Sequence, residues 1–479
     1  MNIINVLKNE TKGHENQLAV IDNNRRISYG ELFLETAKLA SKLESYGVKP
    51  KQRVALIYSD SIEYIIISLA VLSINAVIVP VFPLLSEEEA NDIAKRIGVN
   101  YLISEKEMSI PGSTDQVLLD FVNGKKALIY KYATKEELPK EYHDMNPAFI
   151  RFSSGTTGVS KGVMLSHEAI DKRTSAADEG LKITSSDIII WVLSMAFHFV
   201  VTIFLFLRRA STIVLCSHPF PGAMLEGLKN NKATFIYASP FHYYMLANTD
   251  SFLPEMLADV RLAVSTASRL PDDNADNFHK RFGFELSQAY GIIEVGLPFI
   301  NTSGDKLKRA SVGKILPDYE MKIVNPDNEG IGEVHLRGKG MFESYFSPWQ
   351  KRTELLEDDW FNTGDLGKVD EDGFLYLVGR KKLLINYCGM KVFPHEVESV
   401  INQHPAVRES LVFGVVHPQY GQLPGAKIVL REGGEEFFDN QAMRKFCYQR
   451  LAPYKVPKEF SCVSSLEKTP SGKLKRINS

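Results

Sequence analysis

The sequence lacks the features that mark secreted, nucleic-acid-binding and membrane-anchored proteins. Its 479 residues include only four cysteines, which have neither metal-site spacing nor the density of a disulfide framework, and this favours reduced thiols in a cytoplasmic protein. The formal net charge is −2, from 56 basic and 58 acidic residues, so neither a nucleic-acid surface nor a polybasic membrane anchor is expected. The first ten residues contain no basic segment followed by an apolar core, so no signal peptide is expected.

Two apolar stretches, residues 64–84 and 188–207, contain no Asp, Glu, Lys or Arg. Both are long enough to cross a bilayer, which takes about 20 apolar residues. The first contains Asn75, Pro80 and Pro83, which favour a helix, a turn and then a strand, and the second begins with a β-rich run before a helical one. We therefore predict that both are buried parts of an α/β core and that the chain has no membrane span.

A concentration of small, hydroxyl and basic residues lies at positions 153–162, Ser-Ser-Gly-Thr-Thr-Gly-Val-Ser-Lys-Gly. Glycine lets the backbone approach an anion closely, hydroxyls add donors, and lysine adds positive charge, so the stretch predicts a phosphate-binding loop. It is not a Walker A loop, because Ser160 and Gly162 break that pattern. A flexible Ser/Gly linker is the alternative, but it would not need Lys161. The candidate phosphate ligands are Ser153, Ser154, Gly155, Thr156, Thr157, Gly158 and Lys161.

Helical and extended periodicities alternate through the first 310 residues, which predicts doubly wound, largely parallel sheets and an α/β fold. The predicted helices are 26–46, from residue 60 onward, 87–97 and 166–181, and the predicted strands are 53–58, 77–81, 101–104, 212–215, 235–237 and 261–264. From Ser311 onward, short strands alternate with turn-forming Pro, Asp, Asn and Gly, which predicts a small antiparallel β subdomain. A boundary near residues 379–383 precedes an independent α+β pattern long enough for a small domain.

Six short motifs then occur in order along the chain: residues 27–32, 153–162, 288–294, 360–366, 379–382 and 469–473. In this order and spacing the chain resembles the adenylate-forming superfamily of acyl-CoA synthetases, luciferase-like enzymes and adenylation domains of nonribosomal peptide synthetases. The resemblance implies a large N-terminal domain (1–379), a hinge (380–382) and a small mobile α+β C-terminal domain (383–479). It also implies ATP and Mg²⁺ as cofactors.

The resemblance assigns nucleotide-binding roles to several motif residues. It implies that Tyr290 covers the adenine, that Asp365 and Arg380 bind the ribose, that Lys382 is the hinge residue, and that Glu294 with Thr156 holds Mg²⁺. The remaining expected nucleotide contacts are Gln288, Ala289, Gly291 and Ile293. Each position also has a plainer explanation: an aspartate in Thr-Gly-Asp suits a turn, a glutamate on a helix is ordinarily a surface carboxylate, and Lys382 could be a basic loop residue.

Lys473, in Thr-Pro-Ser-Gly-Lys, matches the mobile catalytic lysine of this superfamily. Without its Pro-Ser-Gly context it would be interpreted as a solvated lysine of a basic tail. Two anions, the substrate carboxylate and the α-phosphate, must approach each other in adenylate formation, so a cation aligned with both is needed. In the superfamily the C-terminal domain then rotates about the hinge, withdraws this lysine and presents residues 389–392 for thioester formation.

The acyl side is expected at the Phe197-His198 pair, which often borders and gates the acyl pocket in the superfamily, although a lone histidine in an apolar run is commonly a core residue. The other expected substrate-site residues are Val201, Thr266, Ala267 and Gly291.

The chain departs from the superfamily pattern in having Ile293 in place of threonine, which is expected to slow adenylation, and bulkier residues at 201 and 266. No aspartate follows His198 to pair with a substrate ammonium, which would be costly to bury alone. The expected substrate is therefore an apolar or aromatic carboxylic acid.

The resemblance thus implies an ATP-dependent acid–thiol ligase with CoA as the first expected acceptor. The phosphopantetheine of a carrier protein is the alternative, because Asn386 and Cys388 replace lysines that some CoA ligases carry. A third hypothesis, of a different class, is a nucleotide-binding relative with weakened catalysis. The sequence does not specify the acid or the oligomeric state.

Overall fold

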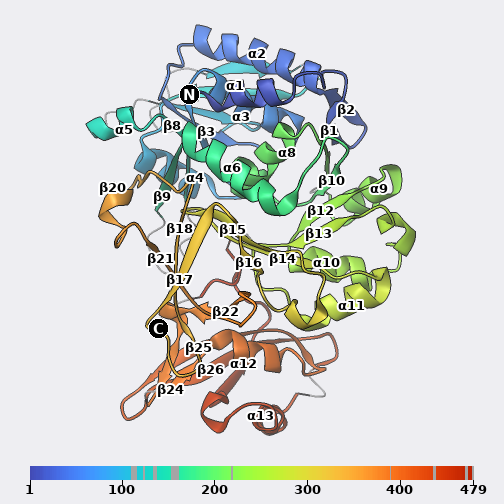
Figure 1. Ribbon diagram of the computed structural model, residues 1–479, viewed down its shortest axis with the longest axis vertical. Coiled ribbons are helices and arrows are strands. Elements are labelled where there is room, and N and C mark those ends of the chain that lie inside the picture. The colour runs from blue at the N-terminus through green and yellow to red at the C-terminus, as the bar shows by residue number, and fades with distance from the viewer. Residues whose placement is uncertain are drawn as a thin grey trace. The chain divides into compact units, whose positions relative to one another are not determined.

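The computed structural model describes residues 1–108, 116–121, 124–132, 138–152, 161–216, 219–388, 390–434, 438–469 and 473–476. These residues form two compact units (Figure 1). The first contains described residues of the ranges 1–152, 161–320 and 337–359, and the second those of 321–336 and 360–476. The predicted α/β class, with a large N-terminal sheet domain and a smaller C-terminal one, is confirmed.

A nine-stranded sheet forms one half of the first unit, with a parallel centre and antiparallel strands at both edges. Its order is β16 (Lys314–Ile315), β15 (Gly296–Asn301), β14 (Ser287–Ile292), β13 (Leu262–Ser265), β12 (Phe235–Ala238), β10 (Ile188–Trp191), β11 (Thr212–Leu215), β1 (Leu18–Asp22) and β2 (Arg25–Ser28). The central strands are continuous apolar runs because parallel strands are buried on both faces.

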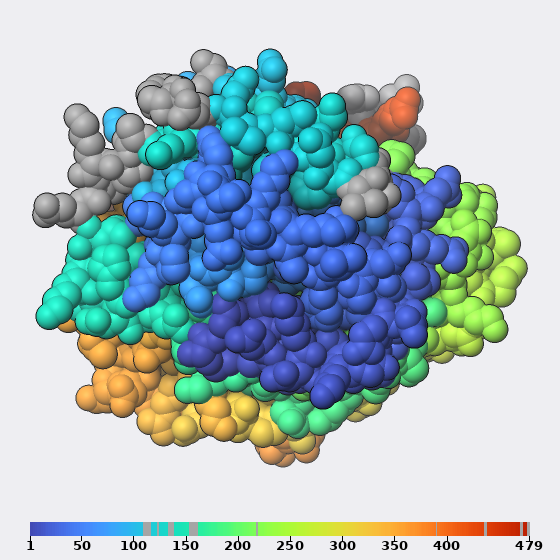
Figure 2. Space-filling view, turned by 90° about the horizontal axis from the view of Figure 1, so that it is seen from above, coloured from blue at the N-terminus to red at the C-terminus, as the bar shows by residue number. Residues whose placement is uncertain are grey.

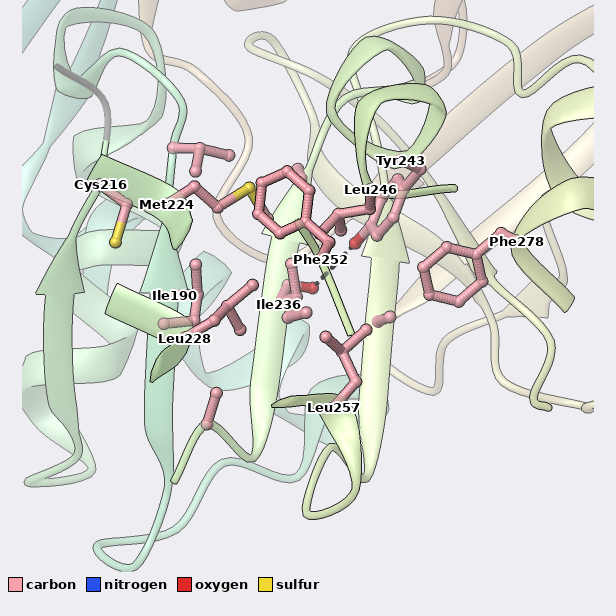
Figure 3. Close-up of a cluster of buried hydrophobic side chains, with 14 of the residues drawn as sticks. Ile190, Cys216, Met224, Leu228, Ile236, Tyr243, Leu246, Phe252, Leu257 and Phe278 are labelled. Carbon is pink, nitrogen blue, oxygen red and sulfur yellow. Dashed lines mark hydrogen bonds between the residues drawn. The ribbon is translucent and has the colours of Figure 1, made fainter. Parts of the chain in front are cut away.

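Helices cover both faces of this sheet. Successive residues of a strand point to opposite sides, so the apolar central strands present buried side chains on both faces. On one face, Ile190 and Ile236 pack with α9 (Gly222–Asn230), α10 (Pro240–Asn248) and α11 (Asp272–Phe282) (Figure 3). There the buried Tyr243 hydroxyl donates to the carbonyl oxygens of Ile236 and Val264, at 3.1 and 2.9 Å. On the other face, aromatic rings of the neighbouring positions pack with α8 (Phe204–Arg208).

A second nine-stranded sheet completes the first unit, and its parallel core is β4, β3 and β5 with β8 beside β4. Its order is β20 (Gln350–Lys351), β19 (Ser344–Tyr345), β9 (Gly162–Ser166), β8 (Pro147–Phe152), β4 (Val77–Pro80), β3 (Arg53–Ile57), β5 (Tyr101–Ser104), β7 (Lys126–Lys131) and β6 (Gln116–Asp120). The other helices of this unit are α1 (Ile3–Glu10), α2 (Tyr29–Ser45), α3 (Ile62–Ser73), α4 (Glu87–Ile97), α5 (Lys140–Asp144), α6 (His167–Leu181) and α7 (Met195–His198). The N-terminal segments, coloured blue in Figure 2, cover one face of the first unit.

Local signals fix the ends of several predicted helices. In α4, Ser86 and Glu89 form a reciprocal capping box, and Gly98 ends the helix in the left-handed conformation. The predicted range 87–97 is therefore confirmed to the residue. The helix α2 begins with the same kind of box, from Ser28 and Glu31, and ends before Gly47.

Both apolar stretches that were long enough to cross a bilayer fold as predicted. Every residue of α3 except its last is buried, and β4 is buried throughout. The second stretch forms β10, α7, a π-helix (Phe199–Ile203) and α8. Among the helices that the structure describes, none is both long and apolar enough to span a membrane.

The second unit contains most of a four-stranded sheet and an α+β part. The first sheet has the order β17 (Tyr319–Val324), β18 (Gly332–Gly338), β21 (Phe361–Val369) and β22 (Leu375–Arg380), with β18, β21 and β22 paired antiparallel as predicted. The α+β part packs α12 (Pro394–Ile401) and α13 (Asn440–Tyr448) with β23 (Ile385–Tyr387), β24 (Met390–Val392), β25 (Val407–His417), β26 (Gly421–Leu430) and β27 (Glu459–Cys462).

Some elements were missed by the sequence reasoning. The strand β9 follows the Ser/Thr/Gly-rich loop directly and pairs antiparallel with β8, so the loop connects two strands of one hairpin. The hairpins β1–β2 and β6–β7 were also missed, as was the π-helix. These strands are short, and pairing partners rather than local composition define them.

Candidate functional site

The predicted site residues fall into the two units, and each group has its own geometry. In the first unit, the predicted phosphate ligand Lys161 and the predicted metal ligand Glu294 meet at Tyr345. The Tyr345 hydroxyl donates to Glu294 Oε1 at 3.0 Å, and Lys161 Nζ lies 4.4 Å from the centroid of the Tyr345 ring. Burial, followed by the negative charge of Glu294, raises the pKa of Tyr345 above its usual range, so this hydroxyl is a donor. Strand pairing explains the arrangement, since Tyr345 lies opposite Val163 in β19 and β9.

The rest of the predicted phosphate loop lies outside the described residues. This applies to Ser153, Ser154, Gly155, Thr156, Thr157 and Gly158, whose roles remain predictions. The two ends of the loop are described, at Phe152 in β8 and Lys161 before β9.

Glu294 lies in a tight turn between β14 and β15 and not on a helix, which corrects the helical setting considered from the sequence. A register shift between Tyr290 and Ile292 marks a β-bulge just before this turn. A Cβ atom on Gly291 would lie 2.5 Å from the carbonyl oxygen of Gly296, so only glycine fits at the bulge. Bulges of this kind re-aim side chains beside active sites.

A Mg²⁺ ion is compatible with the donor chemistry at Glu294. This ion prefers one or two carboxylates together with phosphate oxygens and water, and Glu294 supplies a single partly exposed carboxylate. Among the described residues, no group of three or more His, Cys, Asp or Glu side chains is placed to hold a metal.

The other expected nucleotide contacts of this motif are fixed by the protein itself. The buried Gln288 side chain accepts from the Leu270 amide at 3.2 Å and donates to the Arg309 carbonyl. The half-buried Tyr290 ring lies 6.1 Å from that of Phe299, and the carbonyl of Ile293 accepts from the buried Arg173 guanidinium at 3.0 Å. Ala289, between Gln288 and Tyr290 in β14, is half-buried. Residues 288–294 therefore form a strand end and a turn that are held by hydrogen bonds to the surrounding protein.

The expected acyl side is built at the carboxyl ends of three parallel strands. Trp191 ends β10, Tyr237 lies near the end of β12, and Thr266 directly follows β13. The Tyr237 and Thr266 side chains are hydrogen-bonded, and the Tyr237 ring stacks on Trp191 with the planes 9° apart. The His198 ring meets both aromatics edge-on, with centroids 5.8 Å from Trp191 and 6.4 Å from Tyr237. Open α/β sheets bind ligands at this edge.

The structure brings together His198 and Thr266, two of the residues predicted to border the substrate, through two aromatic side chains that the sequence reasoning missed. Their substrate role stays a prediction. Trp191 is fully buried, and its indole N–H has no hydrogen-bond partner among the described residues. His198 precedes the π-helix that contains Val201, and its carbonyl accepts from the Thr202 hydroxyl at 2.8 Å. π-helical turns are often found at functional sites, so the π-helix that follows His198 is a local feature consistent with a functional role for this segment.

Arg151 connects the start of the phosphate loop to the Phe197-His198 segment. Its guanidinium donates to the carbonyl of Phe197 and lies 6.0 Å from the Phe197 ring. Burial lowers the pKa of Arg151 to about 10, against an opposing effect of Glu294. Asp60 holds the same segment by accepting from the Met195 amide at 2.9 Å.

Ala267, an expected substrate-site residue, has a φ of +71°. An L-residue with a Cβ in this left-handed region is disfavoured by about 1–2 kcal/mol, whereas glycine adopts it freely. We expect Ala267→Gly to raise the free energy of unfolding by about 0.5–1 kcal/mol, after the extra backbone entropy of glycine in the unfolded chain is subtracted. Urea unfolding measures the change. The matched control is Ala263→Gly in β13, a buried strand position, which should lower stability; a similar loss for Ala267→Gly would contradict the prediction.

In the second unit, the two residues expected at the ribose face each other. Asp365 and Arg380 are antiparallel partners in β21 and β22, and Arg380 Nε lies 2.7 Å from Asp365 Oδ1. The Asp365 amide donates to the Thr363 hydroxyl at 3.0 Å, and Arg380 Nη1 donates to the Thr363 carbonyl at 3.2 Å. The Asp365 side chain is buried while Arg380 is largely exposed, so the pair presents a fixed carboxylate beside a cation. Thr363, which fixes both, was missed.

The expected hinge residue and catalytic lysine are both on the surface of the second unit. Lys382 is exposed in a short 3₁₀-helix, Lys381–Leu383. Lys473 is exposed, and its backbone amide donates to the Thr469 hydroxyl at 3.2 Å.

Comparisons with known proteins agree with the motifs. A family model described as AMP-binding enzyme matches residues 7–346, and a model described as AMP-binding enzyme C-terminal domain matches residues 396–473. The chain is 27% identical over 503 residues to the probable CoA ligase CCL5 of Humulus lupulus, covering 97% of this chain and 90% of the relative. It is 26% identical over 518 residues to the mitochondrial medium-chain acyl-CoA ligase ACSF2 of Mus musculus, covering 96% and 83%.

The fold also matches a solved structure. ATP-bound MatB from Rhodopseudomonas palustris superposes with a TM-score of 0.85 at 23% identity, covering 99% of this chain and 97% of that chain. This similarity extends over both units and establishes the shared fold.

Proposed function

The chain belongs to the AMP-binding enzyme family, and we propose that it activates an apolar or aromatic carboxylic acid with ATP and transfers the acyl group to CoA. At the coarser level it is an AMP-forming adenylating enzyme of the acid–CoA ligase type. The choice of acid, the use of CoA rather than a carrier protein, and the individual residue roles are the parts that we propose.

The proposed reaction has two steps. A carboxylate oxygen of the substrate attacks the α-phosphorus of ATP, and the bond to the β-phosphate breaks, which releases pyrophosphate and leaves an acyl-adenylate. The thiolate of CoA then attacks the acyl carbon, and the bond to AMP breaks with AMP as leaving group. Bound Mg²⁺ would neutralise charge on the leaving pyrophosphate.

The observation that carries the proposal is the arrangement of Lys161, Tyr345 and Glu294. A cation and a carboxylate are held on one buried tyrosine, at the end of the predicted phosphate loop. We propose that Lys161 binds phosphate oxygens and that Glu294, with Thr156, would hold a Mg²⁺ ion that neutralises part of their charge. In the second unit, we propose that Asp365 accepts from the ribose hydroxyls and that Arg380 contacts the ribose.

The substrate class is supported by the side chains around His198. The rings of Trp191 and Tyr237 pack against it, and burial raises the pKa of Tyr237 to about 12, so that hydroxyl stays neutral. Aromatic side chains at the carboxyl edge of the sheet favour an apolar or aromatic acyl group over one with a free ammonium group. We propose His198, Val201, Thr266, Ala267 and Gly291 as residues that border this group.

We further propose that the N-terminal domain (1–379) and the C-terminal domain (383–479) move about a hinge at residues 380–382 between the two steps. Lys473 would act in the first step only. All four cysteines are free thiols, two buried and two exposed, which supports the proposal of a cytoplasmic protein.

Pyrophosphate release tests the function. The assay contains ATP, Mg²⁺ and a panel of aliphatic, aromatic and amino acids, each with and without CoA. We expect release with one aliphatic or aromatic acid class, stimulated by CoA, and acyl-CoA as the product by mass spectrometry. Release that CoA leaves unchanged would move the acceptor to a carrier protein. Release with amino acids alone would contradict the substrate class, and no release with any acid would favour the catalytically weakened relative.

A further inference from the structure

The described residues 467–469 and 473–475 pair with one another as two short antiparallel segments, which are called the Lys473 hairpin below. The Thr469 amide donates to the Lys473 carbonyl at 2.7 Å, and the Lys475 amide donates to the Glu467 carbonyl at 2.8 Å. Lys468 and Leu474 form an isolated antiparallel bridge. None of these bonds connects the hairpin to the rest of its unit.

The lysine side chains of the hairpin lie on the surface of the unit. Lys468, Lys473 and Lys475 are exposed, and the hairpin borders a cavity of about 370 Å³ in the same unit. The walls of this cavity include Leu411, Phe413, Val463, Glu467, Lys475 and Arg476. A partly exposed pair, Lys468 Nζ to Glu409 Oε2 at 2.8 Å, reaches β25, and pairs open to solvent typically contribute less than about 1 kcal/mol.

Arg476, three residues after Lys473, makes the strong connection. Its two terminal nitrogens donate to both carboxylate oxygens of Glu398 at 2.9 and 2.8 Å, a bidentate pair, and Arg476 Nη2 also lies 3.2 Å from His395 Nδ1. Both side chains of the pair are nearly buried, at 9% and 7% exposure. Bidentate, charge-assisted pairs fix direction as well as distance.

Glu398 is itself fixed in the core of the unit. It lies on α12, where its neighbours Val397 and Ile401 are fully buried, and its Oε1 accepts from the Val412 amide of β25 at 2.8 Å. Burial alone would raise the pKa of Glu398, but hydrogen bonds from His395 and Arg476 outweigh it and lower the pKa to about 2. The carboxylate is therefore charged and immobile at neutral pH.

We infer that the Arg476–Glu398 pair is the anchor that positions the Lys473 hairpin for the adenylation step. This inference rests on the proposed function. Arg476 is then a positioning residue that acts through Lys473, and its removal should affect the step that uses Lys473 and spare the step that does not.

The test separates the two half-reactions in Arg476→Ala. Pyrophosphate release is measured with octanoate or cinnamate, whichever the wild type uses faster, and thioester formation with the matching synthetic acyl-adenylate and CoA. We expect adenylation to fall about 10- to 100-fold, since small misplacements of a reacting group cost this much, and thioester formation to stay within about threefold. In a Lys473→Ala background, Arg476→Ala should cause no further loss of adenylation.

Two further variants control for stability. Arg476→Ala leaves Glu398 buried without its partner, which destabilises, so Glu398→Gln/Arg476→Met removes both charges together and should give the same selective loss. Lys455→Ala removes an ion pair in which Lys455 Nζ lies 2.6 Å from Oε1 of Glu396. Glu396 is on the same helix α12 as Glu398, whereas Lys455 lies in a separate 3₁₀-helix, Pro453–Lys455, so this variant should leave both half-reactions unchanged.

Three results would overturn the inference: equal losses in both half-reactions, an additional loss in the Lys473→Ala background, or unchanged adenylation. A wild type that releases no pyrophosphate with either acid would instead count against the proposed function. The anchor is then tested by hydrogen exchange, where Arg476→Ala should speed exchange of the Lys475 amide and Lys455→Ala should not; equal exchange in both variants would refute the anchor.

Discussion

Replacing Lys473 with alanine is expected to slow pyrophosphate release by about 100- to 1,000-fold, the effect of removing one charge-stabilising group from a transition state. The carboxylate of the acid and the α-phosphate are both anionic, and the proposed role of Lys473 is to neutralise them only when they are aligned. Its side chain is exposed and its backbone is held in a hairpin. ATP affinity, measured by calorimetry, should change by less than about threefold, because the interaction is made in the transition state.

Lys475→Ala is the matched control for this prediction. Lys475 is exposed on the same hairpin, two residues away, and lies 3.4 Å from Glu467 in an exposed ion pair. Its removal changes the charge of the segment by the same amount as Lys473→Ala. We expect less than about a twofold change in pyrophosphate release, as for an exposed pair. Pyrophosphate release retained in Lys473→Ala would refute the catalytic assignment, and equal losses in both variants would reduce it to a general effect of positive charge.

Elements with local signals could be predicted from the sequence, as the helix α4 shows. Its capping box and terminal glycine are written in consecutive residues, and the predicted range matches the structure. The strand β9 was missed because its ends depend on pairing with β8 and β19, which lie before and long after it in the chain. Short strands are defined by such partners more than by their own composition.

The residues of the candidate site also fall into those that the sequence motifs identify and those that only the fold reveals. Motif residues such as Asp365 and Arg380 could be selected from the sequence, but their antiparallel register brings them into contact, and only the fold determines that register. Tyr345 was missed because it belongs to none of the motifs, although it contacts Lys161 and Glu294. The setting of Glu294 in a turn also follows from a β-bulge at Gly291, which periodicity does not reveal.

Glu294→Gln is expected to lower pyrophosphate release on the order of 100-fold at millimolar Mg²⁺, because the proposed metal ligand loses its charge. Glutamine has the same shape, and its amide oxygen can still accept the 3.0 Å hydrogen bond from Tyr345. The variant should also need more Mg²⁺ for half-maximal rate. A titration of pyrophosphate release against Mg²⁺ at saturating ATP measures both effects.

Tyr345→Phe separates the metal role of Glu294 from a structural one. This variant removes the hydroxyl that holds the carboxylate but keeps the ring beside Lys161 and the charge of Glu294. If Glu294 binds Mg²⁺, losing one neutral hydrogen bond should cost only about tenfold or less in rate, with a small change in Mg²⁺ dependence. If Glu294 serves only to orient Tyr345, the two variants should lose rate equally and keep the Mg²⁺ dependence of the wild type. A selective shift of that dependence in Glu294→Gln therefore decides between a carboxylate that holds the metal and one that only orders the site.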